Sequence, residues 1–137
     1  MKNIKTNQQV KLRRDIMDTV NRLKAVTFVD LMLAVKGFAG DKKMPVDKAK
    51  DYGVLWPWMS DTAMAVMEEL LKQKKLVYFP TTREYYKWAM KTSIKETEDP
   101  DSYLPNLEVM YLGDATKDDP ASKDEWLPIV FALPGKD

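Results

Sequence analysis

The stretch "SDTAMAVMEELLKQKKLVYF", residues 60–79, changes from a helical pattern to a strand pattern, and this change limits the folds that the chain can adopt. Ser60 is of a residue type that caps helix N-termini,. The apolar residues that follow it recur at helical spacing: Ala63, Met67, Leu70 and Leu71,. The β-branched and aromatic run "KLVYF" at 75–79 is typical of a strand,. The stretch therefore predicts a helix that begins after Ser60 and is followed directly by a strand.

Two more helices are predicted before residue 60. The first runs from about Asn7 to Lys24, because an apolar stripe recurs there at spacings of three and four: Leu12, Ile16, Val20 and Leu23,. The second begins at Thr27, since Thr27 and Asp30 have the spacing of a capping box, with Asp30 in place of the usual Glu,. Its buried stripe consists of Leu31, Ala34, Val35 and Phe38.

Residues 80–95 allow two interpretations. Residues 80–83 can form a turn from which "EYYKWAM" returns as an antiparallel strand, and we expect this hairpin,. Thr81 and Glu84 also have capping-box spacing, so residues 82–95 could instead form a helix,. After Lys95 the composition becomes acidic, and two runs of strand length follow, "LEVMYL" (107–112) and "WLPIVFAL" (126–133). We therefore expect a basic domain at 1–95 and an acidic C-terminal segment with two short strands at 96–137.

The order helix, helix, helix, strand, turn, strand over residues 7–90 resembles the winged helix-turn-helix superfamily. The segments "TFVDLMLAV", "SDTAMAVMEELLKQ" and "KKLVYFPTTREYYKW" carry the resemblance. It implies an α+β fold of three main helices and a β-hairpin wing, to which this chain adds a small acidic β-containing appendage. Many such domains place the third helix in the major groove of DNA and the wing on the backbone or in the minor groove. The resemblance therefore implies DNA binding.

Two features depart from that pattern. The groove-facing positions of the third helix would be about Asp61, Thr62, Ala65, Glu68 and Glu69. Carboxylates are poor base readers, because phosphates repel them and their usual base contact is limited to accepting from a cytosine amine. The connection before the third helix, residues 39–59, is also longer than the short turn usual in this superfamily.

The charge of the chain is unevenly distributed. Residues 1–95 hold 19 Lys/Arg and 10 Asp/Glu, a net charge of +9, and residues 96–137 hold 3 and 11, a net charge of −8. This asymmetry indicates either a body that faces a polyanion and carries a separate acidic tail, or two parts that pack together and neutralise each other. Arg83 and Lys87 alternate with aromatic residues. Such cations bind phosphates and such aromatic rings stack on unpaired bases. In the alternative, the aromatic residues close a small core and the lysines only face solvent. The predicted nucleic-acid contacts are Arg13, Arg14, Arg22, Lys72, Lys74, Lys75, Arg83, Tyr85 and Lys87.

The segment "VLWPWM" supports a different function. Its two Trp residues either close a small core or, if exposed, are typical interface anchors,. The alternative to DNA binding is therefore a winged-helix module that docks onto a protein through the third helix and the Trp-Pro-Trp loop. Its predicted contacts are Trp56, Trp58, Asp61, Glu68 and Glu69.

The residue types present exclude many other functions. The chain has no Cys and no His, which removes disulfides, zinc fingers, thiol nucleophiles and His-based triads, and it has no GxGxxG or Walker pattern,. It also lacks the apolar run of roughly 20 residues that a membrane helix needs, and its N-terminus shows no secretory signal,. We expect a non-enzymatic, cytoplasmic protein that binds DNA without a metal or cofactor. It would act as a transcription regulator or a replication accessory, and its small size is typical of phage or plasmid proteins. The partner is DNA in this interpretation, and a protein or a second copy of the chain in the alternative.

Overall fold

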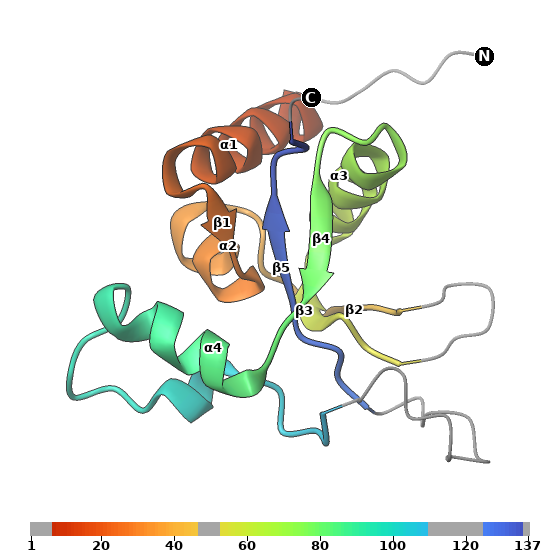
Figure 1. Cartoon of the computed structure of the whole chain (residues 1–137). Helices are drawn as coiled ribbons and strands as arrows, with labels where there is room; N and C mark the ends of the chain where they lie inside the picture. Colours follow the sequence, from red (N-terminus) through yellow and green to blue (C-terminus); the bar gives the residue numbers. More distant parts are fainter. Residues whose placement is uncertain (1–6, 47–52, 110–124, 136–137) are drawn as a thin grey trace.

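Helices α1, α2 and α3 gather on one side of a small antiparallel sheet in the computed structural model (Figure 1). The structure describes residues 7–46, 53–109 and 125–135. The helices span Asn7–Leu23 (α1), Phe28–Ala34 (α2) and Asp61–Lys72 (α3), and the fold is α+β as predicted. Among the described residues, no helix has the length and apolar character needed to cross a bilayer.

Within the described residues, the main sheet has three strands: β1 (Ala25–Val26), β4 (Val77–Pro80) and β5 (Ile129–Ala132). Their order is β1-β5-β4, and both outer strands run antiparallel to β5. The central strand thus comes from the end of the chain, and Trp126, Ile129 and Phe131 belong to the same buried core as the helices. The core therefore crosses the boundary that the sequence analysis placed at Lys95.

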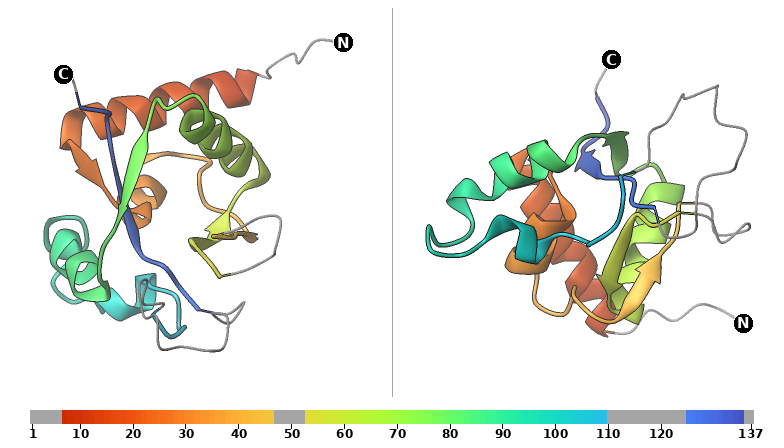
Figure 2. Two further views of the ribbon diagram at one scale, coloured as in Figure 1. Left: turned by 45° about the vertical axis from the view of Figure 1, so that its right-hand side comes forward. Right: turned by 90° about the horizontal axis from the view of Figure 1, so that it is seen from below.

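A second antiparallel pair, β2 (Lys42–Met44) and β3 (Trp56–Met59), occupies the long connection between α2 and α3. This pair closes the core from the side opposite α1, as the views in Figure 2 show. Of the two apolar runs predicted as C-terminal strands, the second contains β5. Val109 of the first run forms an isolated bridge with Trp126, and residues 110–112 lie outside the described ranges.

Local capping signals position α2 and α3 as predicted. The Asp30 backbone N–H donates to Thr27 Oγ1 over 3.1 Å, and the Thr27 N–H donates to Asp30 Oδ2 over 2.9 Å, which completes the capping box. Burial raises the pKa of Asp30, and hydrogen bonds from Thr27 and Ser93 act in the opposite direction. Ser60 caps α3 by accepting from the Ala63 N–H over 3.0 Å.

The predicted wing hairpin is wrong, because residues 83–89 form helix α4 (Arg83–Ala89). Thr82 caps this helix by accepting from the Tyr85 N–H over 3.0 Å. Tyr86 and Met90 are buried, whereas Trp88 between them is 62% exposed. A strand would place all three side chains on one face, so the burial follows helical spacing rather than strand alternation. The short 3₁₀ turns η1 (Met90–Thr92) and η2 (Pro100–Tyr103) follow, and β5 takes the place of the expected returning strand.

Tyr86 attaches α4 to the rest of the core. Its side chain is fully buried, its hydroxyl donates to the Ile129 carbonyl over 2.6 Å, and it accepts from the Phe28 N–H over 3.3 Å. One hydroxyl thus joins α4 to the first turn of α2 and to the start of β5. Burial raises the pKa of Tyr86 far above its ordinary value, because the phenolate would lose its hydration,.

Replacing Tyr86 by Phe should lower the free energy of unfolding by about 1–3 kcal/mol, since two buried backbone groups lose their partner. Because the unfolded chain ionises its tyrosines near pH 10 while the folded chain keeps Tyr86 protonated, this stabilisation is present below about pH 10 and is lost as the pH rises above it,. Urea unfolding of wild type and Tyr86→Phe at about pH 8 and about pH 11 measures both effects. Tyr85→Phe, at a half-buried position, is the matched control and should change stability by less than about 0.5 kcal/mol,. Equal stability of Tyr86→Phe and wild type at the lower pH would contradict this role.

Candidate nucleic-acid interface

The sheet register brings lysines from two distant segments to one end of the molecule. Ala25 of β1 and Val77 of β4 both lie opposite Ala132 of β5, so β1 and β4 run parallel on either side of it. Lys24 directly precedes β1, and Lys74 and Lys75 precede β4, which places the three at the same end of the sheet. The two strands lie about 10 Å apart on either side of β5. Figure 1 shows this end at the top, where α1 and the turn from α3 to β4 meet.

We call this surface the basic end and define it as Arg14, Arg22, Lys24, Lys72, Lys74 and Lys75. All six residues are exposed. Within the described residues, none of them forms an ion pair with a carboxylate, although burial raises the pKa of the Asp30 carboxyl and the charge of Arg22 acts to lower it. Like charges at this spacing raise the local positive potential and attract polyanions.

Two of these lysines occupy a backbone conformation that favours glycine. Lys24 has φ 73° and Lys74 has φ 59°, each just after the end of a helix. The Lys24 N–H donates to the Val20 carbonyl over 2.7 Å, and the Lys75 N–H donates to the Leu70 carbonyl over 2.9 Å. A left-handed residue other than glycine costs about 1–2 kcal/mol, whereas a cation at a helix C-terminus contributes only about 0.3–1 kcal/mol. Fold stability alone therefore does not favour lysine at these two positions.

Arg13 has a different role from the other α1 cations. Its guanidinium forms an ion pair with Glu69 of α3 and donates to Gln73 Oε1 over 2.9 Å. This contact holds α1 against the C-terminal half of α3. Arg13 was predicted to contact phosphate and Glu69 to contact a protein. In the structure these two side chains form an ion pair with each other.

The predicted wing cations lie away from the basic end. Figure 1 places α4 at the opposite end of the molecule. Arg83 donates to the Pro105 carbonyl over 3.0 Å and lies 3.4 Å from Asp101 Oδ1, with its guanidinium 5.8 Å from the centroid of the Trp126 ring. Lys87 Nζ is also 3.4 Å from Asp101 Oδ1. The predicted cations therefore lie in two separate places, and the two on α4 share one carboxylate of the acidic segment.

Aromatic residues on the surface of α4 remain accessible. Tyr85 is half-buried, and its ring centroid lies 5.6 Å from that of Trp88, which is 62% exposed. Tyr86, which the sequence placed in the same aromatic group, points into the core instead. Because these residues lie on a helix, Tyr86 faces the core while Tyr85 and Trp88 lie on the outer surface.

The Trp-Pro-Trp segment forms part of the core. Trp56 is fully buried and stacks on Phe28, with ring centroids 5.3 Å apart and planes at 8°. Trp58 is half-buried and meets Trp56 edge to face at 5.3 Å. The prediction that Trp56 anchors a protein interface is therefore wrong, because its ring has no accessible surface. Asp61, in the first turn of α3, is exposed, and Glu68 is half-buried.

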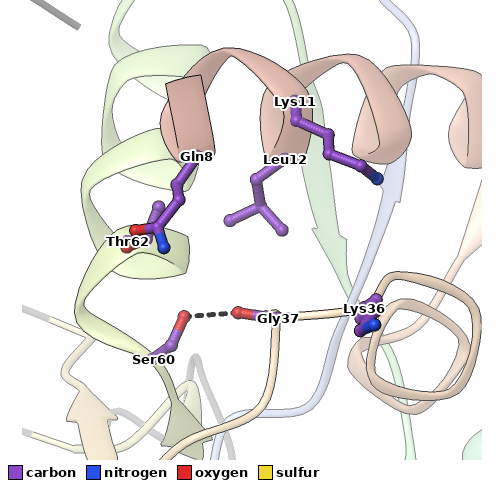
Figure 3. A pocket seen from close by; sticks show the side chains of 7 residues that line it. All are labelled: Gln8, Lys11, Leu12, Lys36, Gly37, Ser60 and Thr62. Atoms are coloured by element: carbon purple, nitrogen blue, oxygen red, sulfur yellow. Dashed lines mark hydrogen bonds between the residues drawn. The ribbon is translucent and has the colours of Figure 1, made fainter. Parts of the chain in front are cut away.

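A cleft of about 430 Å³ lies between the first turns of α1, the end of α2 and the start of α3 (Figure 3). Leu12 and Gly37 form its apolar part, and the Ser60 hydroxyl donates to the Gly37 carbonyl over 2.7 Å beneath it. Lys11 and Lys36 border the cleft, but Lys11 pairs with Asp15 over 2.8 Å. Of the described residues that line the cleft, Lys36 thus brings the one unpaired ammonium group, and none belongs to the basic end.

The described residues contain no group of three or more Asp or Glu residues that could hold a metal ion. Comparison with models of protein families, with curated protein sequences and with solved structures finds no match for this chain.

Trp56→Ala should destabilise the fold by about 3–5 kcal/mol, because it removes a fully buried ring at the centre of the core,. Trp88→Ala should change the free energy of unfolding by less than about 1 kcal/mol, because most of that ring is exposed,. Urea unfolding followed by far-UV circular dichroism measures both. A folded and stable Trp56→Ala variant would contradict the placement of Trp56 in the core.

Proposed function

We propose that this chain is a winged-helix protein that binds nucleic acid through phosphate contacts at the basic end and has no enzymatic activity. The element order supports the winged-helix part of the proposal. Apart from the inserted β2–β3 pair, the order is α1, β1, α2, α3, β4 and β5, and β5 pairs between β1 and β4. Helix α4 and the segment after it stand between β4 and β5, where winged-helix domains carry the wing.

The convergence of Lys24, Lys74 and Lys75 at one end of the sheet is the observation that carries the binding function. Each is exposed, and within the described ranges none has a carboxylate partner. Arg83 and Lys87, in contrast, already share Asp101, so a phosphate would have to displace that carboxylate. Cations without a carboxylate partner can neutralise phosphates directly, so they gain more binding free energy from the release of counterions than cations that are already paired.

The outer surface of α3 favours backbone contacts over base reading. Asp61 and Ala65 are its most exposed positions towards the N-terminus, and neither donates a side-chain hydrogen bond at neutral pH,. The cations of α3 lie in its last turn and just beyond it, at Lys72, Lys74 and Lys75. Such a distribution suits a protein of low sequence specificity whose affinity depends on salt.

A protein-interaction function is the second candidate, and the exposed Trp88 favours it. Trp88 and Tyr85 form an accessible aromatic pair of the kind that supplies interface anchors,. In this alternative the docking surface is α4 together with the half-buried Trp58 and the acidic first turn of α3, rather than the buried Trp56.

The double variant Lys24→Gly/Lys74→Gly tests the nucleic-acid proposal with little risk to the fold, because glycine accepts the left-handed conformation at both positions,. Its affinity for duplex DNA should fall, and the slope of log K against log salt should decrease by about one for each phosphate that the variant no longer neutralises. Fluorescence anisotropy titrations of duplex and single-stranded DNA at about 50 and 200 mM salt measure both quantities.

Lys36→Gln/Lys91→Gln is the matched control, because it removes the same charge from exposed positions outside the basic end. It should keep the wild-type salt slope. Equal reductions in affinity for the two double variants would mean that net charge alone drives binding and would remove the basic end from the proposal. If folded wild type binds neither DNA form at low salt, the proposal is wrong and Trp88→Ala should be tested for loss of a protein partner.

A further inference from the structure

The outward face of the main sheet is apolar. Directly paired residues of antiparallel strands point to the same face, and Val26, Ile129 and Phe131 point into the core,. The residues that alternate with them face away from α1, α2 and α3: Ala25, Val77, Phe79, Val130 and Ala132. Antiparallel sheets with one solvated face usually carry polar residues there. The apolar outward face of this sheet is therefore unusual for a surface in contact with water.

Strand β4 presents the most accessible part of this surface. Among the described residues it pairs with β5 alone, so its other side has unpaired backbone groups. Tyr78 is 46% exposed and Phe79 is 55% exposed, on opposite faces of the same strand. Edge strands are usually protected by charge or proline, and β4 has only Pro80 at its end,. The strand thus offers hydrogen-bonding groups flanked by two aromatic side chains.

The two ends of β4 carry opposite charges. Lys74 and Lys75 precede the strand. At the other end of the strand, Pro80 lines a cleft together with Glu84 and Glu108. Within the described ranges, none of these four side chains forms an ion pair. Arg83 lies in the same cleft, but its guanidinium already contacts Asp101 and the Pro105 carbonyl. The strand therefore has lysines at its start and glutamates at its finish.

We propose that β4 pairs antiparallel with β4 of a second copy of this chain in a two-fold symmetric dimer. The two-fold axis places the lysines of each copy beside the glutamates of the other, so the charges complement each other at both ends of the strand pair. Phe79 of each copy packs across the junction on the outward face, within reach of the Val77 and Phe79 side chains of the second copy. A nucleic acid does not fit this surface, because its centre is apolar and one end is acidic.

Sedimentation velocity of the full chain without nucleic acid, over about a hundredfold range of protein concentration, tests the proposal. The chain should form a dimer that weakens as salt rises. Phe79→Lys should raise the dimer dissociation constant by about tenfold or more, because it places a charge in the centre of the contact. Leu33→Lys makes the same change at an exposed apolar residue of α2, away from β4, and should leave the dissociation constant unchanged. A monomer at every concentration, or a dimer insensitive to Phe79→Lys, would overturn the proposal.

A charge exchange tests the antiparallel orientation. Lys75→Glu and Glu84→Lys should each weaken the dimer, and the double variant should restore it, because the ion pairs across the axis re-form with reversed sign. Circular dichroism of each variant confirms that the fold is retained. Failure of the double variant to recover wild-type affinity would overturn the antiparallel arrangement. Since no nucleic acid is present, these results are independent of the DNA-binding proposal, and either can fail alone.

Discussion

The aromatic cluster around Trp56 holds together segments from both ends of the chain. Trp56 meets Phe28 of α2, Tyr86 of α4 and Trp126 of the C-terminal segment, with ring centroids 5.3, 6.1 and 6.1 Å away. Phe131 of β5 completes it by meeting Phe28 edge to face at 5.0 Å. Buried aromatic side chains contribute much of a small core through the apolar area they remove from water. These rings come from segments distant in the sequence, so the cluster joins the helical part to the end of the chain.

The position of β5 follows from this cluster, and the basic end follows from β5. Strands β1 and β4 do not pair with each other, and β5 between them sets their register, while the contact of Arg13 with Glu69 and Gln73 holds the preceding helices together. That register brings Lys24 close to Lys74 and Lys75, although about fifty residues of sequence separate them. The acidic segment is not a separate tail that balances the charge of the basic end. Part of the segment enters the core, and Asp101 pairs with both Arg83 and Lys87, while within the described ranges no cation of the basic end forms an ion pair.

The distribution of charge and apolar surface separates two kinds of contact on this small fold. Cations in the left-handed turns after α1 and α3 suit a diffuse polyanion, since phosphate contacts need charge and exposure rather than precise geometry,. The edge of β4 suits a partner that supplies a strand, since it combines unpaired backbone groups with Tyr78 and Phe79,. Both surfaces meet at Lys74 and Lys75, so dimerisation and nucleic-acid binding would share part of one turn.

Local sequence signals, which act between residues three or four positions apart, were enough to predict some of the elements. The apolar stripe of α1, the capping box at Thr27 and Asp30, and the Ser60 cap of α3 are local, and these three helices are present. Helix α2 ends at Ala34, which is exposed, so its predicted helical stripe up to Phe38 is too long. The choice between helix and strand at 83–89 was made by tertiary structure, because Tyr86 fits the core only from one face of a helix and β5 supplies the strand that β4 needs. Burial of Trp56, the pairing of Arg13 with Glu69 and the gathering of the basic end also required tertiary structure. The physical reason is common to all three: capping and periodicity are short-range backbone properties, whereas burial and charge pairing depend on which distant segments the core brings together.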